Sequence, residues 1–194
     1  MQEKEISNEE SLKLINRMIY QAKGYFYESG LSGLIYGFSI LICTMLTYFY
    51  EKGDIHFPFH PFYLMVPVFI IQAYVQLKEE KKKKAKTFTD EAIDYVWVGF
   101  FLSVFAAFCG VFAGAGYIVI TIILFLTGFA SFLTGMITKF RYNIICGIIC
   151  LLIAAVSFFI QNVNIYFLLA AVSIMVWLIP GFILKAHFKK MHHD

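Results

Sequence analysis

The sequence predicts an all-α protein, a polytopic transmembrane bundle of six helices preceded by an amphipathic helix. Of its 194 residues, 60% are hydrophobic and 15% are charged, whereas about a quarter of the residues in a soluble domain are charged. Apolar stretches about long enough to cross a bilayer as helices recur six times along the chain. Lysine and arginine gather in every second connection between these stretches. Together these observations exclude an ordinary soluble domain.

The N-terminal segment, residues 1–29, is predicted to form an amphipathic helix at the cytoplasmic surface. Ser7 and Glu10 have the spacing of a capping box, and apolar residues then recur at helical intervals from Leu12 to Phe26. Two placements remain open, in the lipid headgroups or against the bundle as a cap. The acidic residues at the start of the segment argue against a signal peptide.

The transmembrane domain is expected to occupy residues 30–185, with a cytoplasmic tail at 186–194. We predict its six spans at 30–50, 62–78, 95–114, 117–138, 144–160 and 165–185. Pro67 and Pro180 are expected to kink the second and sixth spans. The six spans are either three consecutive repeated hairpins or helices that share only the alternation imposed by topology.

The basic residues predict the orientation of the spans. Of the 16 lysine and arginine residues, Lys52 alone falls on one side of the predicted membrane. Because lysine and arginine are retained on the cytoplasmic side, this distribution predicts an even number of spans with both termini cytoplasmic. We therefore expect a multi-pass protein of the cytoplasmic (inner) membrane of a bacterium.

Small side chains form ridges that predict close helix packing. In lipid, helices associate where small residues let their backbones approach. The predicted packing residues are Gly33 and Gly37 in the first span, Ala106, Gly110 and Gly114 in the third, and Thr127, Ser131 and Gly135 in the fourth. Cys146, Cys150 and Ala154 form a weaker ridge in the fifth. The ridges either hold this chain together or join it to a second copy.

Candidate chemistry is sparse. An ionisable residue in mid-membrane usually marks a transport or catalytic site, and no predicted span carries one in its middle. Gln72 and Gln76 are candidates for the lining of a polar path, or they bond to neighbouring helices. No catalytic motif is present, so we predict no enzyme and no cofactor.

The loop after the first span contains potential zinc ligands. Asp54, His56 and His60 are suitable side-chain types. Pro58 and Pro61 prevent the helix that would bring the two histidines together. An aromatic turn with exposed histidines is the favoured interpretation, and no metal site is predicted.

A basic cluster follows the second span: Lys81, Lys82, Lys83, Lys84 and Lys86. Beside a membrane, such a cluster attracts anionic headgroups by about 1 kcal/mol per residue. Binding to an acidic partner and a simple topological signal are the alternatives. Nucleic-acid binding is not expected, because topology already accounts for the basic residues.

The segments LTGFASFLTGMITKFRYNIICGIICLLIAAVSFF and WLIPGFILK, with the opening ESLKLINRMIYQAKGYFYESGLSGLIYGF, resemble a group of uncharacterised small six-helix membrane proteins of Bacteroidetes. The resemblance covers most of the chain and implies a class without an activity. The succession of hairpins and the glycine-rich fourth span also resemble, in architecture alone, the HdeD-like acid-resistance membrane proteins.

Two functional hypotheses follow. In the first, the chain is a non-catalytic integral membrane protein that acts by helix-mediated self-association or by binding lipid or a protein partner. In the second, it forms a small oligomeric pore or carrier for an uncharged or small solute, lined by weakly polar groups such as Gln72, Thr121, Thr127 and Thr134.

Overall fold

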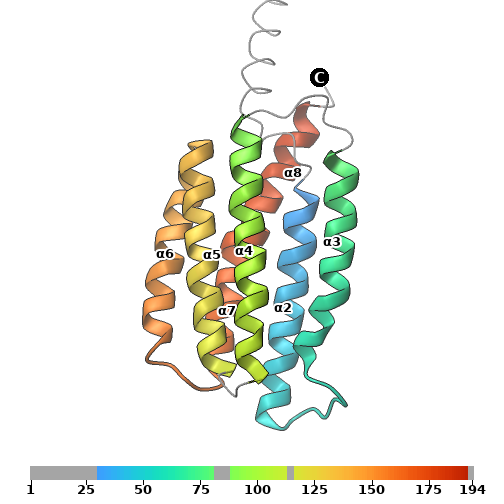
Figure 1. The fold of residues 1–194 in the computed structure, drawn as a ribbon, viewed down its shortest axis with the longest axis vertical. Helices are drawn as coiled ribbons and strands as arrows, with labels where there is room; N and C mark the ends of the chain where they lie inside the picture. Colours follow the sequence, from blue (N-terminus) through green and yellow to red (C-terminus); the bar gives the residue numbers. More distant parts are fainter. Residues whose placement is uncertain (1–29, 81–87, 113–115, 192–194) are drawn as a thin grey trace, which may run out of the picture.

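The computed structural model describes residues 30–80, 88–112 and 116–191, and these form a bundle of long helices running up and down (Figure 1). The elements are α2 (Leu31–Lys52), the short 3₁₀ helix η2 (Pro61–Leu64), α3 (Met65–Glu80), α4 (Phe88–Phe112), α5 (Gly116–Thr138), α6 (Arg141–Ser157), α7 (Ile165–Ser173), the π-helical turn η3 (Ile174–Leu178) and α8 (Ile179–Met191). The described residues include no strand, so the all-α prediction is confirmed for them.

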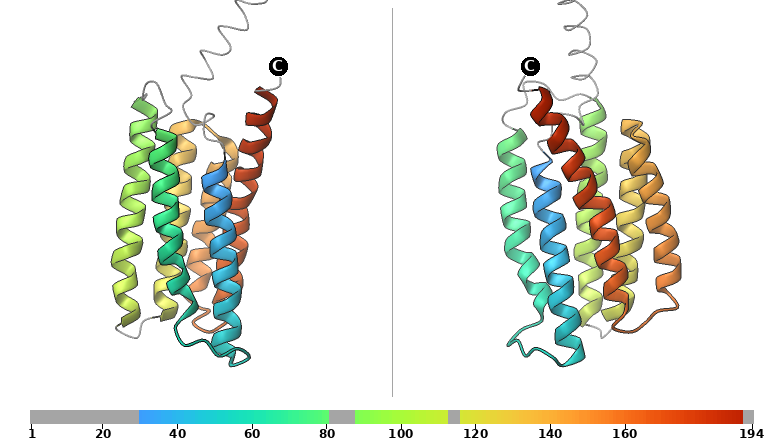
Figure 2. Two further views of the ribbon diagram at one scale, coloured as in Figure 1. Left: turned by 90° about the vertical axis from the view of Figure 1, so that its right-hand side faces the viewer. Right: turned by 180° about the vertical axis from the view of Figure 1, so that it is seen from behind.

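Four helices are long and apolar enough to cross a membrane: α2, most of α4, α5, and the continuous stretch Ile165–Ala186 through α7, η3 and α8. The predicted second and fifth spans correspond to shorter apolar helices. α3 has 16 residues and α6 has 17. At 1.5 Å per residue, each is about 25 Å long. Both nevertheless run alongside the long helices (Figures 1 and 2).

Five of the helical columns surround a central axis. α2 contacts α3 on one side and α7, η3 and α8 on the other, while α5 contacts α4 and α7. α6 packs outside this ring, mainly on α5 (Figure 1). The α3–α4 junction is the sparsest of the ring among the described residues. There the helices meet through aromatic rings, with Phe69 and Phe101 centroids 5.8 Å apart.

The α5–α6 pair is the tightest in the bundle. A Cβ atom added at Gly147 would lie 2.6 Å from the backbone nitrogen of Phe132, and one added at Gly135 would lie 2.6 Å from that of Ile144. No side chain fits at such distances, so the two backbones are in direct contact. In the three-hairpin scheme this pair would join the second hairpin to the third.

Helix α4 begins at Phe88, well before the predicted span at residue 95. Asp90 and Glu91 lie in its first turn, where negative side chains stabilise the positive end of the helix dipole. Hydropathy identifies the membrane-spanning part of a helix but not a polar extension of the same helix. The helix α4 therefore begins before the predicted span.

The two prolines are accommodated differently. Pro67 is the third residue of α3 and lies in its first turn, where the missing N–H removes no interior helical bond. Pro180 follows the π-helical turn of the last column. Only the second proline is linked to an irregularity inside a long apolar stretch.

Several predictions fall outside the described residues. They concern the amphipathic helix at 1–29, the basic cluster Lys81, Lys82, Lys83, Lys84 and Lys86, Gly114, and the last three residues of the tail. Gln76 lies in α3, but its side chain is not described.

Candidate functional site

The predicted ridge in α5 divides between two surfaces. Ser131 and Gly135 face α6, whereas Thr127 faces the centre of the bundle. Each residue advances about 100° around the helix axis, so a residue four positions on lies about 40° beyond a full turn. Gly128 occupies the place at the α6 seam that the ridge assigned to Thr127. Alternating steps of three and four, which keep a straight seam, would have found it.

Polar groups cross the α5–α6 seam. Ser131 Oγ donates to the Asn143 carbonyl at 3.3 Å. Ser157 Oγ donates to Thr121 Oγ1 at 3.1 Å. Cys150, fully buried, directs its thiol to the carbonyl of Leu124 at 3.3 Å. Thr134 is also fully buried in α5, and its hydroxyl has no partner among the described residues.

The glycines of α2 pack against the last helical column. A Cβ at Gly37 would lie 2.8 Å from the side chain of Leu178, and one at Gly33 would lie 3.5 Å from the carbonyl oxygen of Trp177. Ser173 Oγ donates to the Gly37 carbonyl at 2.9 Å. Gly30, which the sequence analysis missed, has φ +66° and sits directly on the carbonyl of Gly181. Gly30 is the N-cap of α2, and the periodicity of the sequence does not reveal that its backbone has a positive φ.

The ridge in α4 does not act as a unit. Gly110 faces α5, where a Cβ would meet the Val119 side chain at 3.1 Å. Ala106 is exposed on the outer face of the helix, beside Gly99, whose Cβ position has no atom within 4 Å. Sequence spacing puts Ala106 and Gly110 on one ridge, but of these two described residues only Gly110 contacts a neighbouring helix in this way.

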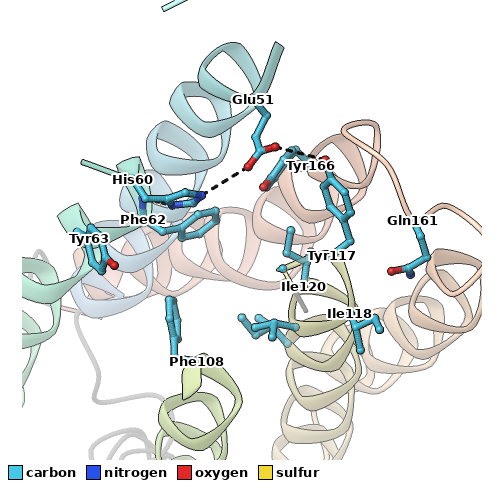
Figure 3. Close-up of a pocket in the computed structure, with 13 residues that line it drawn as sticks. Glu51, His60, Phe62, Tyr63, Phe108, Tyr117, Ile118, Ile120, Gln161 and Tyr166 are labelled. Atoms are coloured by element: carbon cyan, nitrogen blue, oxygen red, sulfur yellow. Dashed lines mark hydrogen bonds and ion pairs between the residues drawn. The ribbon is translucent and has the colours of Figure 1, made fainter. Parts of the chain in front are cut away.

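A pocket of about 630 Å³ opens at the end of the bundle where α2 ends and α5 begins. We call it the end pocket. Its apolar walls are Phe62, Phe108, Ile118, Val119, Ile120 and Ile123, and its polar groups are Glu51, His60, Tyr63, Tyr117, Gln161 and Tyr166 (Figure 3). The lining comes from α2, η2, α4, α5, α7 and the loop before α7.

Glu51 is the centre of the polar groups (Figure 3). Tyr117 donates its hydroxyl to Glu51 Oε2 at 3.3 Å. His60 Nε2 lies 3.7 Å from Glu51 Oε1, an ion-pair distance when the imidazole is protonated. Both side chains of this second pair are about one third exposed, so the carboxylate remains accessible from the pocket mouth. Lys52, the next residue, directs its ammonium group to the Tyr48 ring, 5.8 Å from its centroid.

The orientation of His60 follows from its position as the N-cap of η2. Its Nδ1 accepts from the backbone N–H of Phe62 at 3.4 Å. In a neutral imidazole one nitrogen accepts and the other carries the proton, so Nε2 carries it here. The ring also stacks on Phe62, with centroids 5.9 Å apart. The imidazole therefore presents an N–H to Glu51 whether it is neutral or charged.

The other side of the pocket is fixed by Gln161. Its Nε2 donates to Thr121 Oγ1 at 3.2 Å and to the Ser157 carbonyl at 2.8 Å. The end of α6 is thereby tied to the start of α5. Tyr166 closes the interior side of the pocket, only 4% exposed, with its ring 6.4 Å from those of Tyr117 and Phe62. The pocket is thus apolar inside and polar at its mouth.

A second, smaller cavity of about 40 Å³ lies deeper along the axis of the bundle. We call it the central cavity. Tyr36, Ile40, Met65, Phe69, Phe100, Val104, Thr127, Leu169, Val172, Ser173 and Trp177 line it, together with Phe62, Phe108 and Ile123 from the end pocket. None of its lining side chains is charged.

The π-helical turn positions Trp177 against the central cavity. The backbone N–H of Ile179 bonds to the carbonyl of Ile174, five residues back, rather than to that of Met175. Pro180 has no N–H to offer. The Met175 carbonyl is instead satisfied by the Tyr142 hydroxyl of α6 at 3.0 Å. π-Helical turns inside α-helices are frequent at functional sites.

The remaining candidates lie elsewhere. Gln72 is 5% exposed, its Oε1 has no partner among the described residues, and it lines neither cavity. Asp54 and His56 do not line the end pocket. Within the described ranges, no group of three His, Cys, Asp or Glu side chains is close enough to hold a metal ion. From the sequence, His60 is a candidate only as a potential zinc ligand and Glu51 is not a candidate at all, because the hydrogen bond between Glu51 and Tyr117 links residues 66 positions apart.

Comparison of the chain with protein-family models, with curated proteins and with solved structures gives no match.

Proposed function

We propose that this chain is a non-catalytic membrane protein that binds an amphipathic, lipid-like ligand in the end pocket. The proposal includes six spans in a bacterial inner membrane, with both termini in the cytoplasm. Its topology is supported by the confinement of 15 of the 16 basic residues to the two terminal segments and alternate connections. The lengths of α3 and α6, with the η2 turn and adjoining loop residues, allow two further crossings if the bilayer thins locally.

The observation that carries the proposal is the composition of the end pocket. Its volume of about 630 Å³ lies in the range of small-molecule sites, about 300–1,000 Å³. Such sites are mostly apolar with a few convergent polar groups that orient the ligand. Here the polar groups converge on one accessible carboxylate, Glu51, at the mouth.

The location of the pocket suits a ligand from the membrane. With both termini cytoplasmic, the end of the bundle that holds Glu51 and Gln161 faces the opposite side. A polar mouth over an apolar interior at this depth matches the change from headgroup to hydrocarbon. A ligand from lipid would enter at the sparse α3–α4 junction, where the rings of Phe69 and Phe101 would have to move aside. On the cytoplasmic side, the basic cluster would hold anionic headgroups.

The test compares two glycines that have open space around them. Gly116 lines the end pocket and Gly99 lies on the outer face of α4, and neither has an atom within 4 Å of its Cβ position. Full-length protein and the Gly116→Phe and Gly99→Phe variants would be purified and their bound amphiphiles counted by native mass spectrometry. We expect Gly116→Phe to lose them and Gly99→Phe to keep them. Equal retention in both variants would contradict the proposal.

A small pore or carrier is the second candidate, favoured by the stacking of two cavities along one axis. The narrowness of the central cavity, about 40 Å³, argues against continuous flow. Reconstituted protein should therefore pass no more small solute than empty liposomes. Flux above that baseline, reduced by Thr127→Ile in the central cavity, would favour the pore instead.

A further inference from the structure

We infer that the ligand is a single-chain amphiphile with an amino head, and that the end of its chain enters the central cavity. This inference rests on the proposed function and specifies it further. It makes separate claims about the passage between the cavities, the number of chains and the charge of the head. Each claim follows from a different feature of the described residues.

The two cavities are adjacent. Phe62 of η2, Phe108 of α4 and Ile123 of α5 line both of them. These three side chains form the constriction between the wide end pocket and the central cavity. All three side chains are only partly buried. The end pocket and the central cavity are therefore separated by flexible aromatic and aliphatic side chains, not by backbone. An apolar chain lying in the end pocket therefore points at the central cavity.

The volume of the central cavity limits what enters it. A space that holds one water occupies about 10–15 Å³ on the same measure. At about 40 Å³, the cavity has room for roughly three such spheres. That is enough for the terminal carbons of one apolar chain and too little for two chains. A ligand with two acyl chains would have to leave one of them outside the constriction.

The charge of the pocket selects the head. Glu51 is the only acidic side chain that lines the end pocket among the described residues, and no lysine or arginine lines it. The ammonium of the neighbouring Lys52 is directed to Tyr48. A protonated amine forms a charge-assisted hydrogen bond with a carboxylate, which is stronger than a neutral one. A head whose only charge is negative would find no lysine or arginine in the lining of the pocket.

Trp177 makes the chain end measurable. The protein has two tryptophans. Trp177 lines the central cavity, and the ring of Trp97 packs against that of Trp177, with centroids 4.9 Å apart. Both lie beyond the constriction from Glu51. Bromine atoms quench tryptophan fluorescence on contact, so a bromine at a known carbon of the ligand reports how far the chain penetrates.

The experiment uses full-length protein in nanodiscs of phosphatidylcholine, titrated with lysophosphatidylethanolamine brominated either at the chain end or near the head. We expect saturable quenching at a low mole fraction, several-fold greater for the chain-end bromine. Lysophosphatidylglycerol of the same chain length should bind about tenfold more weakly. Diacyl phosphatidylethanolamine with bromine at a chain end should quench less than the single-chain probe.

Two matched pairs of variants test the passage and the head. Thr127 lines the central cavity and Thr138 does not, yet each donates its hydroxyl at 2.7 Å to the carbonyl four residues earlier in α5. Thr127→Ile should fill the cavity and abolish the chain-end quenching, while Thr138→Ile leaves it unchanged. Glu51→Gln should remove the preference for the amino head, and Asp54→Asn in the adjacent loop should keep it.

The outcomes separate this inference from the proposed function. If the lysolipid binds but both bromine positions quench equally, or if Thr127→Ile has no effect, the inference is wrong and the end pocket remains a ligand site. Loss of the head preference in both carboxylate variants, or in neither, would refute the role of Glu51. If no amphiphile binds saturably, both the inference and the proposed function fail.

Discussion

The α5–α6 seam and the α3–α4 junction are opposite solutions to helix packing in lipid. At the seam, glycines bring the backbones into contact, and hydroxyl and thiol groups donate across it. At the junction, aromatic rings such as Phe69 and Phe101 keep the helices apart, and residues of both α3 and α4 line the central cavity. Small residues thus close one side of the bundle and large residues leave space on the other.

The difference shows how one chain combines rigidity with a cavity. Leu124 and Cys150 at the seam are fully buried, whereas Phe69 and Phe101 at the junction are only partly buried. Without a hydrophobic driving force between helices in lipid, stability depends on close contact. The seam supplies it, and the sparser α3–α4 side leaves room for the ligand that we propose.

The largest effect should come from breaking the seam at a glycine. Gly147→Leu would force a side chain onto the Phe132 backbone, and we expect a loss of at least about 3 kcal/mol in the free energy of unfolding. The measurement is the midpoint of unfolding in mild detergent with added SDS. Gly99→Leu, in open space on α4, is the matched control and should change the midpoint little. Equal effects would mean that the seam is not the rigid side.

The next effect joins the two regions. Tyr142→Phe removes the donor that satisfies the Met175 carbonyl beside Pro180, and should cost about 1–3 kcal/mol. Because this bond holds the turn that carries Trp177, the tryptophan emission should also shift. Tyr95→Phe, on an exposed face of α4, should change neither the stability nor the emission. A stability loss without a change in tryptophan emission would mean that the Tyr142 hydrogen bond from α6 does not position Trp177 at the central cavity.

A smaller effect is expected at the junction. Phe69 contacts the rings of Tyr36 and Phe101, with centroids 5.9 Å and 5.8 Å away. Phe69→Leu should cost about 1 kcal/mol, since an aromatic pair contributes about 0.5–1.5 kcal/mol. It should also enlarge the central cavity and strengthen the binding of the brominated lysolipid. A loss as large as that of Gly147→Leu would remove the contrast between the two regions.

The smallest effect concerns the polar groups of the seam. Ser131→Ala removes a hydrogen bond of 3.3 Å to the Asn143 carbonyl and should cost about 0.6 kcal/mol, the average for such bonds in a membrane bundle. The backbone contact at Gly135 would remain. A loss comparable to that of the glycine variant would mean that hydrogen bonding, rather than close approach, holds the seam.

Particular residues show how far sequence reasoning reaches. The spacing of small residues predicts that Gly37 and Gly135 lie at helix contacts, and both do. The same spacing predicts Thr127 at a helix contact, but Thr127 faces the central cavity, because a step of four residues drifts around the helix. Ala106 shares its spacing with Gly110 but faces outward. Spacing identifies a ridge, whereas the partner of each ridge depends on how neighbouring helices are rotated.

The candidate site was less predictable than the fold. Glu51, His60 and Tyr117 belong to different elements, and no local pattern links them. An ionisable residue in mid-membrane is the usual marker of a functional site. Glu51 instead lies at a helix end, where the free-energy cost of placing a carboxylate is small. Tyr142 and the π-helical turn were equally invisible, since the carbonyl that needs the hydroxyl is exposed only by Pro180 and the shifted helical bond.

By itself, the sequence determined that the chain is helical, that it has helices long and apolar enough to cross a membrane, and where glycines permit close approach. These properties follow from composition and local periodicity, which act within a few residues. Only the tertiary structure decided which glycines meet, that α3 and α4 stand apart, and that one carboxylate caps an apolar pocket. Those outcomes depend on the relative rotation and spacing of helices far apart in the chain, which no local pattern records.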